Sequence, residues 1–148
     1  MARVIDRTDD QGREALAAAG VRLHRVDAGA DAPTDVVSAV LPIDVRHVRA
    51  EVDIAVPDDV DAGMGAWHVN AVDEVHVVGS GKGIMEFVTL DGVVSVLVEP
   101  GDVIEIRGTE HRYQPLTQQR WRLRFGGSPD GELEATATGR AAGPWPSV

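Results

Sequence analysis

The stretch GIMEFVTLDGVVSVLV at residues 83–98 decides the predicted fold. Apolar side chains recur along it on both sides of Asp91-Gly92. Alternation with a period of two is typical of a half-buried strand. Asp-Gly between two such runs is a strong signal for a β-hairpin. We therefore predict strands at residues 83–90 and 93–98, joined by a tight turn.

The chain around this hairpin has the same character from residue 64 onward. Turn sequences interrupt its short apolar runs at Gly79-Ser80-Gly81, Pro100-Gly101 and Gly108. Short strands at this spacing indicate an all-β fold, a small antiparallel barrel or a double-sheet jelly roll. The further strands that we predict lie at residues 64–70, 74–78, 103–107, 111–115 and 121–125.

The N-terminal part is predicted to hold one or two short helices. Residues 12–20 are rich in alanine and end at Gly20, which can close a helix. Thr34 could cap a second helix that Pro42 would end, but this segment is ambiguous. Residues 21–26 and 48–56 alternate as strands do.

We expect one domain over residues 1–148, because the chain has 148 residues and shows no repeat or linker. Its barrel core would span residues 48–126, and residues 127–148, with Pro144 and Pro146, would form an extended tail.

Composition restricts the partners. A formal charge of −10 argues against nucleic acid and against anionic membranes, whose phosphates would repel the chain. No signal peptide is evident, and no apolar run approaches the roughly 20 residues of a membrane helix. The chain has no cysteine, so disulfides and thiolate ligands are excluded. A cytoplasmic location fits these features.

Polar residues cluster where the predicted barrel interior should be. His68 and Asn70 share one strand face, and Glu74 and His76 share another, because side chains at i and i+2 point the same way. Unpaired polar groups inside a barrel cost roughly 1–3 kcal/mol each, so they need partners. Two imidazoles and one carboxylate, from His68, His111 and Glu74, would suit a redox-capable divalent metal. The alternative is a polar pocket that binds its ligand without metal.

Two motifs here resemble those of the cupin superfamily. His68-Val69-Asn70-Ala71-Val72-Asp73-Glu74, followed by Gly81, is similar to the first motif. Gly101-Asp102-Val103-Ile104 and the run Gly108-Thr109-Glu110-His111 are similar to the second. Within the superfamily the chain resembles the acireductone dioxygenases, whose pattern His-x-His-x3-Glu often has the neighbours seen in Asp73-Glu74-Val75. The resemblance implies a cupin-type antiparallel barrel, also described as a double-stranded β-helix.

The resemblance also implies a metal site. It assigns His68, Glu74 and His111 as ligands of one divalent metal, with Asn70 where the family has a second histidine. Iron(II) comes first, and nickel, manganese or zinc are alternatives. His76 stands where the family commonly has arginine. Whether Asn70 coordinates the metal, holds a water or steps back stays open, as does whether His76 moves in.

The activity implied is that of a dioxygenase acting with O2 on a small enediol or a similar 1,2-dioxygenated molecule. His76 or an arginine would serve as base or anion clamp. Arg124 is the arginine we favour for the barrel interior, although Arg120, Arg122 and Arg124 alternate with apolar residues as a solvated face would. Two alternatives are a non-redox metal enzyme (isomerase, cyclase or lyase) and a binding protein without catalysis. Cupins often pair through edge strands, so a homodimer is one expected assembly.

Overall fold

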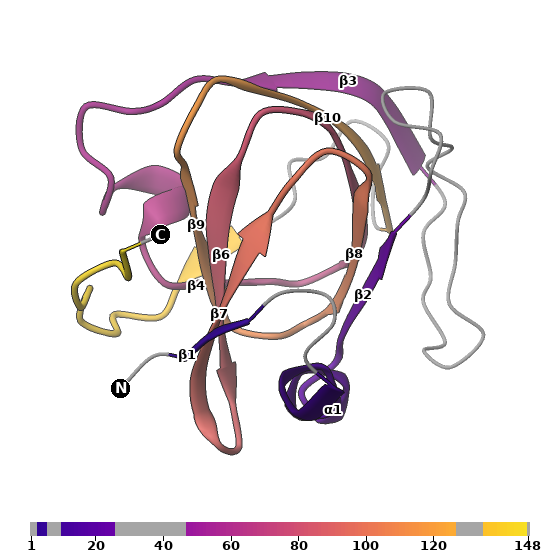
Figure 1. Ribbon diagram of the computed structural model, residues 1–148. Helices are drawn as coiled ribbons and strands as arrows, with labels where there is room; N and C mark the ends of the chain where they lie inside the picture. Colours follow the sequence, from indigo (N-terminus) through magenta and orange to yellow (C-terminus); the bar gives the residue numbers. More distant parts are fainter. Residues whose placement is uncertain (1–2, 6–9, 26–46, 127–134, 148) are drawn as a thin grey trace.

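Two β-sheets face each other and enclose the interior of the protein (Figure 1). The computed structural model describes residues 3–5, 10–25, 47–126 and 135–147. The predicted segments at 34–40 and 127–134 lie outside these residues. Strand pairing is antiparallel in both sheets, except that β1 runs parallel to β7. The predicted all-β fold with a short N-terminal helix is confirmed.

The strand order is β1-β7-β6-β9-β4-β11 in one sheet and β2-β8-β5-β10-β3 in the other, within the described residues. The first sheet comprises β1 (Arg3–Ile5), β7 (Gly92–Val98), β6 (Gly83–Thr89), β9 (His111–Pro115), β4 (His68–Asn70) and β11 (Ala135–Ala137). The second comprises β2 (Val21–Arg25), β8 (Asp102–Arg107), β5 (Asp73–Ser80), β10 (Gln119–Phe125) and β3 (His47–Ile54). The helix α1 spans Asp10–Ala18, and a 3-10 turn, η2, spans Gly63–Gly65.

The predicted hairpin forms, with its turn shifted by one residue. β6 and β7 pair from Gly83↔Val98 to Thr89↔Gly92, so the turn falls on Leu90 and Asp91. Gly92 follows the turn with φ of 107°, a conformation that a side chain would strain. Leu90 at the tip is 92% exposed, because the turn projects beyond the sheet.

The stretch before the site was predicted wrongly as one strand at residues 64–70. Residues 63–65 form η2 instead, and only His68–Asn70 form a strand. Gly65 explains the break, because a Cβ there would lie 1.8 Å from the carbonyl oxygen of Val60. The predicted extended tail contains a short strand, β11, which pairs with β4. β1 was not predicted at all.

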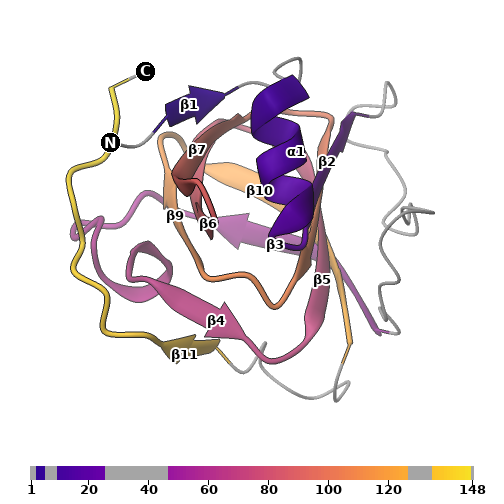
Figure 2. The same cartoon turned by 90° about the horizontal axis from the view of Figure 1, so that it is seen from below.

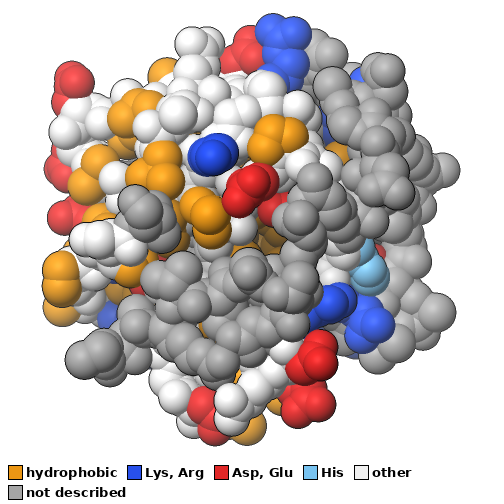
Figure 3. Space-filling model, viewed as in Figure 1, with side chains coloured by type: hydrophobic (Ala, Val, Ile, Leu, Met, Phe, Trp, Pro, Cys, Tyr) orange, Lys and Arg blue, Asp and Glu red, His pale blue; other side chains and the backbone are white. Residues whose placement is uncertain are grey.

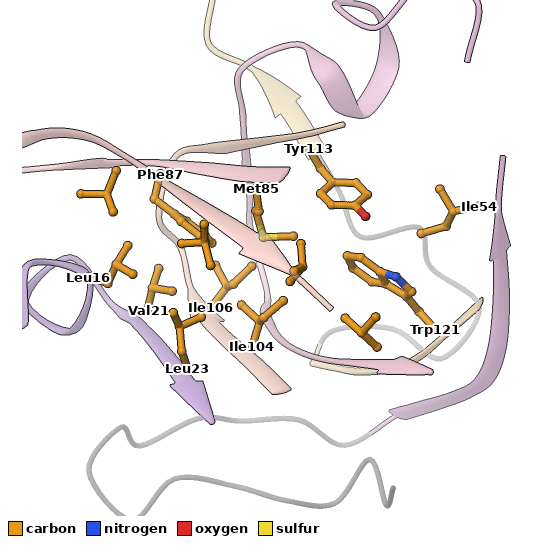
Figure 4. Packing of buried hydrophobic residues seen from close by; sticks show 14 residues of the cluster. Leu16, Val21, Leu23, Ile54, Met85, Phe87, Ile104, Ile106, Tyr113 and Trp121 are labelled. Atoms are coloured by element: carbon orange, nitrogen blue, oxygen red, sulfur yellow. The ribbon is translucent and has the colours of Figure 1, made fainter. Parts of the chain in front are cut away.

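The interior is packed by side chains from both sheets and from α1 (Figure 4). Leu16 of α1 is fully buried and packs into the cluster, and α1 lies beside β2 (Figure 2). The aromatic members of this cluster are Phe87, Tyr113 and Trp121, and Met85 lies between them (Figure 4). Each largely or fully buried side chain of this size contributes about 1.5–3 kcal/mol through the hydrophobic effect.

Charges of both signs are scattered over the face shown in Figure 3. None of the helices in the described residues has the length and apolar character needed to cross a membrane.

Candidate functional site

The polar residues singled out in the sequence line one cavity of about 590 Å³. β4 and β9 contribute from the six-stranded sheet, and β5 contributes from the five-stranded sheet. The register pairs His68 of β4 with His111 of β9, so that the strands themselves bring the two imidazoles together. The residues on the polar side of the cavity are His68, Asn70, Glu74, His76 and His111.

The two imidazole rings lie edge to face with their centroids 4.5 Å apart. Each Nδ1 contacts the carbonyl oxygen two residues earlier: His68 reaches Ala66 and His111 reaches Thr109, each at 2.7 Å. A carbonyl oxygen can only accept, so each Nδ1 carries the hydrogen and donates it. In the neutral form of either ring, the lone pair is then on Nε2. This arrangement, with one ring nitrogen fixed by a backbone carbonyl, is the one found for histidines that bind metals.

Glu74 lies deep beside them, only 1% exposed. Its Oε2 accepts a hydrogen bond from Asn70 Nδ2 at 2.6 Å, and its Oε1 accepts one from His76 Nε2 at 2.9 Å. The Oδ1 atom of Asn70 is buried and has no hydrogen-bond partner among the described residues. Both carboxylate oxygens of Glu74 therefore accept a hydrogen bond, whereas Oδ1 of Asn70 accepts none among the described residues.

The ionisation states follow from burial and charge. Burial raises the pKa of Glu74, but the charge and hydrogen bond of His76, together with His111 and Asn70, outweigh it, and the pKa is lowered overall. Burial lowers the pKa of His111, with Glu74 opposing and His68 adding to the effect. The site therefore combines a carboxylate with a neutral imidazole, which are the forms that bind divalent metals.

The opposite wall of the cavity is apolar. Tyr113 and Trp121 pack edge to face, 4.8 Å between centroids, and Trp121 also meets the ring of His76 at 5.0 Å. Met85 and Ile54 lie beside this pair (Figure 4). A ligand of this cavity would therefore meet polar groups at one end and a water-excluding surface at the other.

Sequence reasoning missed this apolar wall. The signal was present at Tyr113, which lies two positions after His111 and so faces the same side of β9. The distance along the chain to Met85 and Trp121 is too large for any such periodicity to reveal.

Arg124 is not brought to this cavity. Trp121 and Leu123 of β10 line it, and Arg124, next to Leu123, points to the other face of the strand. We therefore leave Arg124 out of the proposed site. Across the described ranges, no group of three or more His, Cys, Asp and Glu side chains is placed so that it could hold a metal ion as it stands.

Comparison with known proteins identifies the architecture. No protein-family model matches the chain, and no curated protein matches it. Among solved structures, it is similar to an acireductone dioxygenase from Bacillus anthracis with a cadmium ion in its active centre. The TM-score is 0.55 at 17% identity, over 78% of this chain and 82% of that one. The likeness shows a cupin-like β-fold. At this identity the likeness concerns the fold and not the reaction.

The two cupin-like motifs of the sequence take neighbouring positions in this fold. The first runs through β4 into β5, and the second runs through β8 into β9. β5 pairs with β8, and β4 pairs with β9. The predicted cupin-type barrel is confirmed. Its strand pairing gathers His68, Asn70, Glu74, His76 and His111 around one cavity.

Proposed function

We propose that this protein is a metal-dependent oxygenase that acts on a small molecule with oxygens on two neighbouring carbons, such as an enediol. One observation carries the proposal. His68 and His111 are fixed side by side by their Nδ1 hydrogen bonds, with basic Nε2 atoms left over, next to the buried carboxylate of Glu74. The cadmium ion in the active centre of the similar Bacillus anthracis structure supports a divalent metal in general.

The residues that would hold the metal are His68, His111 and Glu74. Two neutral imidazoles and a carboxylate are the donor types that such cations take, and iron(II) is the first choice, with nickel, manganese or zinc as alternatives. Glu74 would offer Oε2 to the cation in place of the hydrogen bond that it accepts from Asn70, and would keep on Oε1 the hydrogen bond from His76. When bound, the metal would stabilise the anion of an enediol and supply the redox chemistry that oxygen requires.

Asn70 and His76 would then act on the substrate. The unpartnered Oδ1 of Asn70 is an acceptor for a substrate hydroxyl or a bound water. His76 donates Nε2–H to Glu74, because a carboxylate only accepts, and a neutral ring would keep its lone pair on Nδ1. His76 is therefore our candidate for taking the proton of the enediol, held in orientation by Glu74.

The apolar wall of the cavity implies that the substrate also carries a hydrocarbon part. Met85, Tyr113 and Trp121 would pack against a hydrocarbon part and keep water from the polar end. Exclusion of water strengthens the electrostatic interactions on which proton transfer depends.

One observation favours a second candidate function, a binding protein without metal. Both carboxylate oxygens of Glu74 already have protein donors, so the polar cluster is satisfied except at Asn70. In this alternative the cavity would bind a small polar-apolar molecule through Asn70 and the two imidazoles.

Metal analysis separates the two candidates. Wild-type protein would be loaded in turn with iron(II), nickel, manganese and zinc, passed through a desalting column and measured by elemental analysis. We expect a stoichiometric ion in wild type and its loss in His111→Ala. His24→Gln is the matched control, because His24 contacts Glu105 on β8 and lies outside the cavity. Protein that retains none of the four metals would favour the binding function.

Oxygen uptake tests the reaction class in the loaded protein. Consumption of O2 with an enediol, lost in His111→Ala and kept in His24→Gln, is the expected result. Turnover of the enediol without O2 uptake would instead indicate an isomerase, cyclase or lyase.

A further inference from the structure

Arg112 is the largest fully buried side chain of the described residues, and it lies outside the candidate site. It follows His111 directly in β9, so it points to the opposite face of the strand. Its guanidinium carbon lies 3.8 Å from the ring centroid of Trp145 and 5.0 Å from that of Trp67. We call these three side chains, Trp67, Arg112 and Trp145, the clamp.

Hydrogen bonds to Glu86 and to the carbonyl oxygen of Gly143 fix the position of the Arg112 guanidinium. Its Nε and Nη2 lie 2.8 and 2.6 Å from Oε1 of Glu86, which is itself buried. The other carboxylate oxygen of Glu86 accepts a hydrogen bond from Ser95. Nη2 of Arg112 also donates to the carbonyl oxygen of Gly143 at 2.9 Å. Arg112 therefore connects the strands β6 and β7 to the C-terminal segment, which we define as residues 135–146.

The C-terminal segment is fastened at positions next to the two site histidines. β11 pairs with β4, and the amide of Thr138 donates to the carbonyl oxygen of Trp67, the neighbour of His68, at 3.0 Å. Arg140 forms two 3.0 Å hydrogen bonds to Glu110, the residue before His111. Figure 2 shows the segment running along the outside of the barrel past β4.

Within the described residues, this segment is held at separate anchors: β11 on β4, Arg140 on Glu110, the Gly143 carbonyl on Arg112, and Trp145 Nε1 on Oδ1 of Asp61. A cavity of about 530 Å³ lies beside Arg112, Trp67 and Trp145, between the segment and the sheet. The residues from 135 to 144 are exposed. Loss of one anchor would therefore free the segment without disrupting a packed core.

β4 needs such support. It has three residues, and a single register pair, His68↔His111, joins it to β9 in the described structure. Strands with so few ladder contacts open easily. Trp67, the residue just before β4, adds a cation–π contact to Arg112 of β9, next to the histidine pair.

We propose that Arg112 is a positioning residue, whose clamp with Trp67 and Trp145 fastens the C-terminal segment and thereby keeps His68 and His111 side by side. Ala135 and Ala137 of the segment line the cavity of the candidate site, so the same clamp also maintains one of its walls. The inference rests on the proposed function only in taking the two imidazoles as the binding groups.

The test compares Trp145→Ala with Trp145→Phe in the full-length, metal-free protein. Amide hydrogen exchange is measured by mass spectrometry over β4 and β11, with β5 and β8 as internal references. We expect exchange to be at least about tenfold faster in β4 and β11 of Trp145→Ala, because local opening governs exchange there. Phenylalanine keeps an aromatic face for Arg112 and loses only the exposed hydrogen bond from Trp145 Nε1 to Oδ1 of Asp61. Trp145→Phe should therefore stay much closer to wild type than Trp145→Ala. Unchanged exchange in Trp145→Ala would overturn the proposal.

The ¹H and ¹⁵N resonances of the imidazole rings show whether the histidine side chains have moved. Imidazole ¹H–¹⁵N spectra should show His68 and His111 displaced in Trp145→Ala, and restored in Trp145→Phe, with His24 unmoved in both. Faster exchange with unmoved His68 and His111 resonances would mean that the clamp is only structural, and would also overturn the proposal. Should Trp145→Ala fail to fold, Arg140→Ala loosens the same segment from an exposed anchor and is judged by the same criteria.

Cobalt(II) titration of the same variants keeps this proposal separate from the proposed function. We expect wild type and Trp145→Phe to bind cobalt(II), and Trp145→Ala to bind it about tenfold more weakly, a loss typical for groups that orient metal-bound histidines. If wild type binds no cobalt(II), the proposed metal function fails, and the spectra above still decide the role of Arg112.

Discussion

Asn70 donates its side-chain N–H to Oε2 of Glu74 across 2.6 Å and leaves its own Oδ1 without a partner. One amide therefore stabilises a buried carboxylate through its N–H and offers its oxygen as an acceptor to the cavity.

Replacement of Asn70 by aspartate should destabilise the metal-free protein. The change removes the hydrogen bond and puts a second carboxylate beside Glu74, and each loss of a buried partner costs about 1–3 kcal/mol. Urea unfolding in the presence of a chelator, with wild type alongside, measures the difference. Asn70→Asp as stable as wild type at pH 7 would mean that the Asn70–Glu74 contact is not formed.

Replacement of Asn70 by histidine tests the proposed coordination sphere. An imidazole is a stronger ligand than a neutral amide, so metal retention should rise by about tenfold if this position faces the cation. Competition with a chelator gives the affinity, with His24→Gln as the control. Equal affinity in Asn70→His and wild type would remove residue 70 from the coordination sphere.

The Glu110–Arg140 pair should make stability depend on pH. Hydrogen bonds from Arg140 hold the pKa of Glu110 below its ordinary value near 4.5, with burial opposing slightly. A lowered pKa means that the stabilisation is present above the unfolded-state value and is lost as the pH falls through the folded-state value.

The measurement for this pair compares wild type with Glu110→Gln in urea at several pH values. Arg140 is half-exposed, so we expect a difference of only about 0.2–1 kcal/mol at pH 7, smaller in 1 M salt. The difference should shrink once the pH falls below the unfolded-state value of about 4.3, and it should vanish only below the lower folded-state pKa. A difference that stays constant from about pH 7 to about pH 2 would show that charge is not its cause.

Gly83 allows a test of packing at the apolar wall. A Cβ there would lie 1.9 Å from the hydroxyl oxygen of Tyr113, so Gly83→Ala must displace the ring and should cost about 1–3 kcal/mol. The hydroxyl is buried and has no hydrogen-bond partner among the described residues, so Tyr113→Phe alone should be close to neutral.

The double variant measures the coupling. Gly83→Ala should be less destabilising in the Tyr113→Phe background by about 0.5 kcal/mol or more, because the nearest clashing atom is gone. Denaturant unfolding of the four proteins completes the cycle. Additive effects would place the ring of Tyr113 away from Gly83.

Local patterns predicted most of the fold. Alternation and turn residues located β6, β7, β8, β9 and β10 to within two residues, because a half-buried strand repeats every second residue. They failed at residues 64–67, where a close approach between Gly65 and the backbone of Val60 forces a turn. They also failed for β1 and β11, which have three residues each and are strands only because they pair with β7 and β4.

The sequence by itself determined which chemical groups are available. It showed two motif-bearing segments, a set of imidazoles, an amide and a carboxylate, and a β-rich chain preceded by one or two short helices. Such features depend on spacing along a few residues, which the periodicity of a strand converts into a shared face.

Only the tertiary structure decided how those groups meet. Pairing of β4 with β9 put His68 beside His111. Pairing of β5 with β10 put Glu74 opposite Phe125 and His76 opposite Leu123, with the His76 ring against that of Trp121. It also turned Arg124 away from the cavity and laid the C-terminal segment behind the histidines. These contacts join residues tens of positions apart, and the free energy that selects them comes from packing of the whole barrel, which local sequence does not encode.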